Sequence, residues 1–278
     1  MTVPPIRCGR FSIAFGHRTL IMGIINMEPD SFAGDGLAGD AGAAEARGHE
    51  MAEAGADLLD VGGRSTRPGA PPVDLDEERR RTIPAIRRLA GVGLPVSVDT
   101  FSAQVAAAAL DAGAVIVNDV SGLRGDRAMP SVVARAGVPV VIMDWDDRFD
   151  ARDVVGETVM FLRRQIAAAV AAGIAETQVL VDPGYGFGLA LEQNLEILRR
   201  LRELAVLGRP ILIGTSRKGS IGKVLNLPVN ERLEGTAATV AVAIMNGVDV
   251  VRAHDVRAIV RVARMSDAIT RGMPPLPA

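Results

Sequence analysis

Short hydrophobic runs and longer alanine-rich runs alternate eight times along the chain. The short runs are rich in Val and Ile and are bounded by Gly, Pro, Asn or Asp, which predicts buried strands. These predicted strands span Leu20–Ile25, Leu58–Gly62, Pro95–Asp99, Val115–Asn118, Val138–Met143, Val179–Asp182, Ile211–Gly214 and Val250–Arg252. The runs between and after them predict helices at Ala41–Ala54, Leu75–Ala90, Ala103–Ala112, Met129–Ala136, Val154–Ala172, Leu191–Ala205, Glu231–Asn246 and Val256–Thr270.

A glycine follows five of the predicted helices, in phrases such as Ala54–Gly55–Ala56–Asp57 and Asn246–Gly247–Val248–Asp249. The other three glycines are Gly113, Gly137 and Gly173. Glycine at this position accepts the left-handed backbone conformation that ends a helix. Each of these stops leads into the next strand, except after Gly173, where a few more residues intervene.

Eight strand–helix units in about 250 residues are typical of an α/β fold, the single-domain (β/α)8 TIM barrel. Strands that are hydrophobic on both faces suit a parallel sheet covered by helices, and a doubly wound open sheet is the alternative. We expect residues 20–272 to form the barrel, residues 1–19 to be a leader that packs on or near it, and residues 273–278 to be a loose tail.

Composition excludes several classes of protein. Of 278 residues, 48% are hydrophobic and 23% are charged, which argues against disorder. The single cysteine, Cys8, excludes a disulfide scaffold and a cysteine zinc cluster. A net charge of −2 argues against nucleic acid as a partner. The first 20 residues lack a signal-peptide core and no apolar run is long enough to span a membrane, so we expect a cytoplasmic protein.

Polar residues lie at or just after the carboxyl end of every predicted strand, which is where a TIM barrel carries its chemistry. A single Asp or Asn at such a position can also cap the next helix, so only their convergence argues for a site. They are Asn26, Asp60, Arg64, Arg67, Asp99, Asn118, Asp119, Asp144, Asp182, Ser216, Arg217, Lys218, Arg252 and His254.

These residues divide by charge. Carboxylate and amide groups at Asp99, Asn118 and Asp182 can together bind a planar, amide-like heterocycle. A phosphate-type anion can be held by Asn26 and by the residues that are cationic or can become so, namely Arg67, Arg217, Lys218, Arg252 and His254. The chain has only two lysines, Lys218 and Lys223, among 31 basic residues, so Lys218 is either a chance occurrence or a chemical choice of a compact ammonium.

Other catalytic templates fit poorly. Of three histidines, His17 and His49 lie in the leader and in an early helix, and His254 alone lies among the strand ends. No Ser–His–Asp set presents itself and no HExxH motif occurs. The glycines of residues 184–188 have the wrong spacing for a dinucleotide loop and follow the sixth strand rather than the first.

Seven phrases at the strand ends resemble those of the dihydropteroate synthases, a family of pterin-binding TIM barrels. In order they span residues 26–32, 60–69, 97–100, 118–122, 182–188, 214–218 and 252–255, and together they cover nearly the whole chain from Ile21. The resemblance implies condensation of 7,8-dihydropterin pyrophosphate with p-aminobenzoate, which gives dihydropteroate and pyrophosphate in folate biosynthesis. It also implies an SN1-like reaction, Mg²⁺ as cofactor and a homodimer.

The resemblance assigns roles residue by residue. The pterin pocket would be lined by Asp99, Asn118, Asp182 and Lys218. The pyrophosphate would be held by Asn26, Arg67, Arg252 and His254. Asn26 and Asp30 would bind Mg²⁺. The aminobenzoate would be bordered by Thr66, Pro68, Phe187 and Ser216, with Phe32 closing over it. Asp99, Lys218, Arg252, His254 and Asp30 would be the catalytic residues.

Four positions depart from the family pattern. Glu28, Arg64, Asp144 and Leu189 stand where the family usually has Thr, Glu, His and Lys. Glu28 and Arg64 reverse charge on neighbouring loops, which suggests that they pair. Two alternatives follow from the resemblance: a pterin-binding paralogue with weak or no synthase activity, and a methyltransferase that binds methyltetrahydrofolate. The Ser216–Lys218 and Ser65–Gly69 phrases favour the synthase over the methyltransferase.

Overall fold

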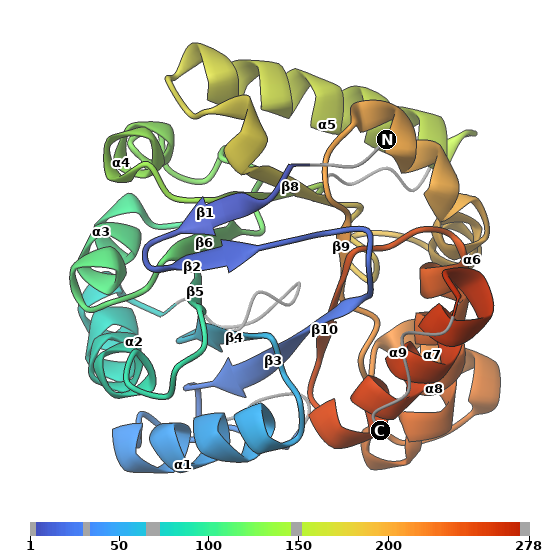
Figure 1. Ribbon diagram of the computed structural model, residues 1–278, viewed down its shortest axis with the longest axis horizontal. Helices are drawn as coiled ribbons and strands as arrows, with labels where there is room; N and C mark the ends of the chain where they lie inside the picture. The colour runs from blue at the N-terminus through green and yellow to red at the C-terminus, as the bar shows by residue number, and fades with distance from the viewer. Residues whose placement is uncertain (1–3, 30–33, 65–72, 146–151, 273–278) are drawn as a thin grey trace.

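Eight parallel strands form a barrel in the computed structural model, which describes residues 4–29, 34–64, 73–145 and 152–272 (Figure 1). The strands are β3 (Leu20–Asn26), β4 (Leu58–Gly62), β5 (Val96–Asp99), β6 (Ile116–Asp119), β7 (Val140–Met143), β8 (Val179–Asp182), β9 (Leu212–Ile213) and β10 (Val250–Ala253). Their order around the sheet is β8-β7-β6-β5-β4-β3-β10-β9. A parallel bridge between Val181 and Ile211 joins the two ends of this order. The prediction of a (β/α)8 barrel is confirmed.

Nine helices of the described chain surround the barrel (Figure 1). They are α1 (Ala41–Glu53), α2 (Leu75–Leu89), α3 (Ala103–Asp111), α4 (Met129–Ala136), α5 (Val154–Ala171), α6 (Leu191–Arg200), α7 (Gly219–Leu225), α8 (Leu233–Met245) and α9 (Val256–Thr270). The five glycines predicted to end helices all have positive φ. The caps that begin α1, α2, α3 and α5 are Asp40, Asp74, Ser102 and Asp153, which leaves Asp99 and Asp182 available for other roles.

The sequence missed or misplaced several helical segments. The predicted helix Leu191–Ala205 is α6 followed by the 3-10 helix η2 (Leu201–Leu207), and the predicted helix Glu231–Asn246 is η3 (Val229–Glu231) followed by α8. Neither α7 nor the single turn η1 (Glu176–Gln178) was predicted. The segments η1, η2, η3 and α7 have three to seven residues, which is too short for a clear helical period.

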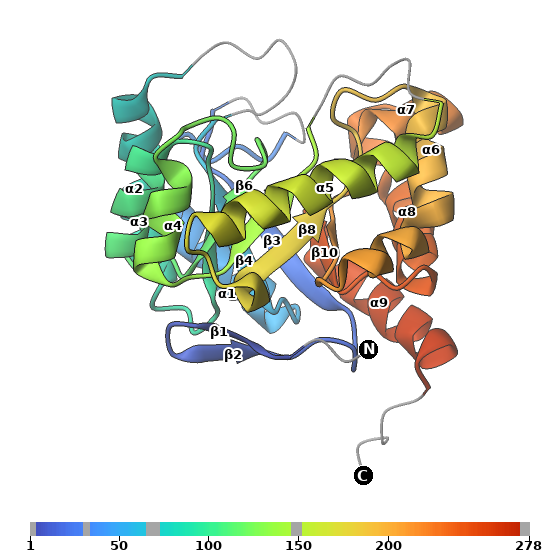
Figure 2. The ribbon, with the colours of Figure 1, turned by 90° about the horizontal axis from the view of Figure 1, so that it is seen from above.

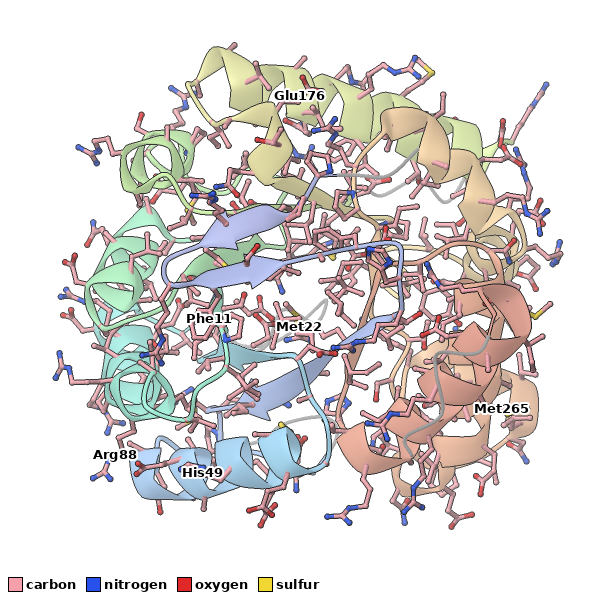
Figure 3. The ribbon with its side chains drawn as sticks, viewed as in Figure 1. Phe11, Met22, His49, Arg88, Glu176 and Met265 are labelled. Atoms are coloured by element: carbon pink, nitrogen blue, oxygen red, sulfur yellow. The ribbon has the colours of Figure 1, made fainter. Side chains whose placement is uncertain are left out.

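Successive residues of each strand face opposite sides of the barrel wall. Residues such as Leu59 and Val61 pack outward with the helices in the main hydrophobic core. Inward-facing residues such as Met22, Leu58 and Ile116 form a second core at the amino ends of the strands. Figure 3 shows Met22 within the ring of strands, whereas His49 and Arg88 lie on the outer surface.

A β-hairpin closes the amino end of the barrel. Its strands β1 (Ile6–Cys8) and β2 (Phe11–Ile13) pair antiparallel and lie across that end of the barrel (Figure 2). Ile6, Cys8 and Ile13 are buried against the inward-facing residues of the barrel strands. The sequence predicted a packed leader but not its strands, because each has only three residues. The hairpin thus places apolar side chains across the amino ends of the strands.

The segment after the hairpin is joined to the last helix. Thr19 donates from its backbone N–H and from Oγ1 to the Asp267 carboxylate at 2.7 and 2.9 Å. Arg271 donates to the same carboxylate and to the carbonyl oxygen of Gly16. In the part of the chain that the structure describes, no helix is long and apolar enough to cross a membrane.

Candidate active site

A cavity of about 320 Å³ opens at the carboxyl ends of the barrel strands. It brings together most of the described residues that the sequence predicted for the site: Asn26, Asp99, Asn118, Asp182, Phe187, Ser216, Lys218, Arg252 and His254. They reach one place because each strand or its following loop supplies an inward-facing residue at the same level of the barrel. The predicted residues Asp30, Phe32, Thr66, Arg67 and Pro68 lie outside the described residues.

Arg252 connects two carboxylates on one side of the cavity. Its Nε donates to Asp60 Oδ2 at 2.6 Å, and its Nη2 donates to Asp99 Oδ2 at 2.9 Å. Asn118 donates from Nδ2 to the same Asp60 oxygen at 3.0 Å. Asp60 is fully buried, and its second oxygen has no hydrogen-bond partner among the described residues. The result is a fixed guanidinium between two carboxylates, with an amide beside it.

The protonation of Asp99 depends on several opposing influences. Burial raises the pKa of Asp99, and Asp60, Glu78 and Asp119 raise it further by repulsion, while Arg252 lowers it. Asp99 Oδ1 has no hydrogen-bond partner among the described residues, although the side chain lines the cavity. A ligand with an N–H group would satisfy that oxygen, and this makes Asp99 a strong candidate for ligand contact.

Lys218 and Phe187 form another part of the wall. Lys218 Nζ lies 3.8 Å from the centroid of the Phe187 ring, and Trp145 packs on the same ring with centroids 5.8 Å apart. Burial lowers the pKa of Lys218 to about 8, although Asp182 opposes this shift. Burial raises the pKa of Asp182 to about 6, although a hydrogen bond from the Gly184 N–H opposes it. The ammonium and the carboxylate thus face one cavity with their pKa values moved toward each other.

Two glycines shape the loop that carries Phe187. Gly184 has φ +72°, and a Cβ on it would lie 1.7 Å from the carbonyl oxygen of Asp144. Gly186 has φ +84°, and its Cβ would lie 2.7 Å from Lys218 Cδ. Only glycine allows these approaches. The loop therefore packs against the lysine stem and sets its position in the cavity.

His254 is buried beside Ser216, with Nδ1 and Ser216 Oγ 2.9 Å apart. Burial lowers the pKa of His254 well below its usual value, and Arg252 and Arg217 lower it further, so the ring is neutral at pH 7. Ser216 Oγ also accepts the backbone N–H of His254 at 3.2 Å. When the Ser216 hydroxyl donates to Nδ1, Nε2 carries the ring proton. His254 then acts in the cavity as a hydrogen-bond donor rather than as the cation that the sequence suggested.

Two expectations about charged residues are corrected. Arg217 does not line the cavity: it has φ +56° and donates to Asp255 through Nε and Nη2 at 2.9 and 2.6 Å. The suggested pairing of Glu28 with Arg64 is wrong, because Arg64 pairs with Glu78, with Nη1 and Oε2 3.4 Å apart. Glu28 and Arg64 both line the cavity, as expected for their loops. Asp144 is buried, and Leu189 is partly buried.

Two site residues received no role from the sequence. Asp60 was among the polar residues at the strand ends, like Asp99 and Asp182, but its role in holding Arg252 depends on a residue 192 positions away. Asp35 accepts from Asn26 Nδ2 at 2.9 Å and lies 4.0 Å from His254 Nε2. Its acidic side chain in a glycine-rich loop was the only available signal.

The described residues contain no group of three or more His, Cys, Asp or Glu side chains that could hold a metal on their own. Mg²⁺ commonly binds through one or two oxygen ligands and the phosphates of a substrate. Asn26 and Asp35 lie together at the cavity and offer amide and carboxylate oxygens of that type. The residues present therefore fit an ion that arrives with a phosphate ligand.

The arrangement suits a ligand with two chemically different parts. Asp99, Asn118 and Asp182 present oxygen and amide groups to a flat heterocycle, beside the aromatic ring of Phe187. Lys218, Arg252 and His254 present N–H donors that an anion would accept. Such a cavity can bind a heterocycle with an attached phosphate group and stabilise charge on each part.

Comparison with known proteins agrees with this geometry. The family model described as pterin binding enzyme matches residues 22–254. A dihydropteroate synthase of Bacillus subtilis is 43% identical over 259 residues, which are 93% of this chain and 91% of the relative. Among solved structures, the dihydropteroate synthase of Xanthomonas albilineans with 4-aminobenzoic acid is 41% identical with a TM-score of 0.90, covering 98% of this chain and 100% of that one. That of Burkholderia cenocepacia complexed with 7,8-dihydropteroate is 37% identical with a TM-score of 0.88, covering 97% of each chain.

Proposed function

Because the chain belongs to the pterin binding enzymes and, within them, to the dihydropteroate synthases, we propose that its cavity joins a dihydropterin pyrophosphate to p-aminobenzoate and releases pyrophosphate. This is a transferase reaction of folate biosynthesis. The observation that carries the proposal is the cluster of Arg252, Asp99 and Asp60, which fixes a guanidinium and an unsatisfied carboxylate oxygen in one cavity.

The pterin ring contacts Asp99, Asn118, Asp182 and Lys218 in this proposal. The carboxylates accept from the ring and amino N–H groups, and the Asn118 amide and the Lys218 ammonium bind ring acceptors. Phe187 supports the ammonium from one side, at 3.8 Å. The loop at Gly186 packs against the lysine stem, and the lysine presents a compact ammonium rather than a planar guanidinium to the pterin.

The pyrophosphate is held by Asn26, Arg67, Arg252 and His254. Arg252 supports this assignment because two carboxylates already hold its guanidinium in place, so it need not reorganise when charge develops on the leaving group. His254 contributes a neutral N–H donor. Asn26 and Asp30, with Asp35 as an added candidate, would hold Mg²⁺, and the bound ion would neutralise charge on the phosphates.

The reaction proceeds by loss of the leaving group first. The bond between the pterin methylene carbon and the pyrophosphate oxygen breaks, and its electron pair leaves with pyrophosphate. Asp99, next to the pterin, stabilises the positive charge left behind. The arylamine nitrogen then bonds to the methylene carbon and loses a proton to water or to the departing pyrophosphate. Thr66, Pro68, Phe187 and Ser216 border the aminobenzoate, and Phe32 closes over it.

Turnover of the purified protein tests this function. With dihydropterin pyrophosphate, p-aminobenzoate and Mg²⁺ present, we expect dihydropteroate and pyrophosphate in equal amounts, with turnover abolished by Asp99→Ala. Arg88→Met, on the outer face of α2, is the matched control and should retain the parent rate. Pterin binding without dihydropteroate formation would favour the inactive paralogue, and methyl transfer from methyltetrahydrofolate would favour the methyltransferase.

We also propose that the chain forms a homodimer through α8 and α9. Both helices carry large exposed apolar side chains, namely Val242 and Met245 on α8 and Met265 and Ile269 on α9. Figure 3 shows Met265 on the outer surface of the protein, where a second copy could cover it. Light scattering would detect the dimer, and Met245→Glu should convert it to monomer. A cytoplasmic location is likewise proposed, and fractionation of the producing cells tests it.

A further inference from the structure

Arg64 occupies an unusual position at the edge of the cavity. Its guanidinium carbon lies 3.1 Å from the centroid of the Phe101 ring, and the side chain is only 12% exposed. Nη1 faces Glu78 at 3.4 Å, while Nε and Nη2 are buried without hydrogen-bond partners among the described residues. A buried guanidinium is costly unless a carboxylate compensates its charge, and here Glu78 is the carboxylate within reach.

Glu78 comes from the opposite direction, on the inner face of α2. Its side chain is fully buried, whereas its neighbours Asp76 and Glu77 on the same turn are not. Oε1 accepts from Thr100 Oγ1 at 2.6 Å, and Thr100 follows Asp99 directly in the chain. Glu78 therefore lies between Arg64 and the strand end that carries Asp99.

We propose that Arg64 and Glu78 are positioning residues that act on Asp99: their opposite charges cancel beside that carboxylate, so that its ionisation is governed by the cavity and not by α2. The proposed role of the pair depends on the proposed function in one respect: the proposed function assigns Asp99 to the pterin. The geometry assigns the pair this role because the two side chains are in contact and largely withdrawn from solvent, Arg64 lines the same cavity as Asp99, and Glu78 accepts from Thr100, the residue after Asp99.

Several charged groups face Asp99 from the elements around it: Asp60 of β4, Glu78 of α2, Asp119 of β6, Arg252 of β10, Lys218 after β9 and Arg64 after β4. Glu78 raises the pKa of Asp99 by repulsion, whereas Arg64 interacts favourably with Asp99 and Asp119 as well as with Glu78. The two members of the pair therefore shift the pKa of Asp99 in opposite directions, so that their effects can cancel.

The test is a titration of the Asp99 carboxyl in the unliganded protein by NMR, with 13Cγ-labelled aspartate and assignment through the signal lost in Asp99→Asn. In Glu78→Gln, Arg64 keeps its charge but loses its partner, so the Asp99 midpoint should fall by about one pH unit. In the double variant Arg64→Met/Glu78→Gln both charges are gone, and the midpoint should return to that of the parent.

Two further variants complete the test. Arg64→Lys keeps the positive charge beside Glu78, so its midpoint should match the parent, and it supplies a result if Glu78→Gln does not fold. Glu45→Gln removes the carboxylate of a surface pair with Arg88 and should leave the midpoint unchanged. The proposal is overturned if Glu78→Gln leaves the midpoint unchanged or higher, if the double variant stays low, or if Arg64→Lys departs from the parent.

The NMR measurement separates this proposal from the proposed function, since it needs neither substrate nor turnover. If the midpoints move as expected and no dihydropteroate forms, the function fails while the pair stands. If dihydropteroate forms and the midpoints do not move, the pair fails alone. Where both hold, the acid limb of the kcat/KM profile should fall to lower pH in Glu78→Gln and return in the double variant.

Discussion

Replacing Asp60 by Asn tests whether the carboxylate beneath the cavity holds Arg252 in place. Asp60 Oδ2 accepts from Arg252 at 2.6 Å and from Asn118 at 3.0 Å, and the side chain is fully buried. The amide keeps a carbonyl oxygen of nearly the same shape but removes the negative charge. The change is therefore mainly electrostatic, with little loss of packing.

The magnitude follows from the two hydrogen bonds. A hydrogen bond to a charged group contributes about 1.5–3 kcal/mol, against about 1 for a neutral one, so Asp60→Asn should lower the free energy of unfolding by about 2 kcal/mol. If the same energy positions Arg252 in the transition state, kcat/KM should drop about 30-fold. Because Asp60 also raises the pKa of Asp99, the acid limb of the pH profile should move to lower pH.

Urea unfolding and steady-state kinetics between pH 5 and pH 9 measure these effects. Glu45→Gln, in an exposed ion pair with Arg88, is the control and should change neither quantity appreciably. The reasoning is refuted if Asp60→Asn keeps the parent's stability and kcat/KM, or if its acid limb moves to higher pH. Loss of stability with normal kinetics would restrict Asp60 to a purely structural role.

Three other predictions concern separate parts of the protein. The pKa of Lys218 is lowered to about 8, so a reaction that needs its ammonium should slow as pH rises through that value. Lys218→Ala should reduce turnover by about 100-fold below that pH, and the difference should shrink at higher pH, where the parent loses its ammonium. Gly184→Ala should prevent normal folding, seen as lost thermal unfolding cooperativity, because its Cβ would lie 1.7 Å from the Asp144 carbonyl oxygen; a parent-like melting curve would contradict this. Asp267→Asn weakens the hydrogen bonds that Thr19 donates to this carboxylate, so the free energy of unfolding in urea should fall by about 2 kcal/mol. We expect kcat to stay at the parent value. A changed kcat would show that the amino end of the barrel influences the active site.

The sequence predicted the barrel well because each strand and helix is specified by residues that are close together in the chain. Alternating strand and helix patterns, and the glycines after helices, specify each unit without reference to distant residues. The strand ends then give the position of Asp99, Asn118 and Asp182 through the barrel geometry alone. The short hairpin and α7 escaped because they contain too few residues to show a period.

The sequence could not predict interactions between residues that are far apart in the chain. The pairing of Arg64 with Glu78 joins a loop to the buried face of a helix that carries two other acidic residues, Asp76 and Glu77, beside it. The neutral state of His254 likewise results from burial and from two nearby arginines, which no local pattern reveals. Charge states and partners thus depend on the assembled barrel, while the positions of the residues depend mainly on the strands.

Residues two apart in a barrel strand face the same side of the barrel wall, and this spacing links the floor of the barrel to its cavity. Leu58 and Asp60, Ile116 and Asn118, and Leu180 and Asp182 are each two residues apart: the first of each pair lies in the apolar core under the hairpin and the second lines or supports the cavity. One residue inserted between the two members of such a pair would place them on opposite faces of the barrel wall. Either the polar member would then face the helix layer or the apolar member would leave its core. A single-residue insertion in the wall therefore removes part of the floor of the barrel or part of the cavity, and no local adjustment of that strand restores both.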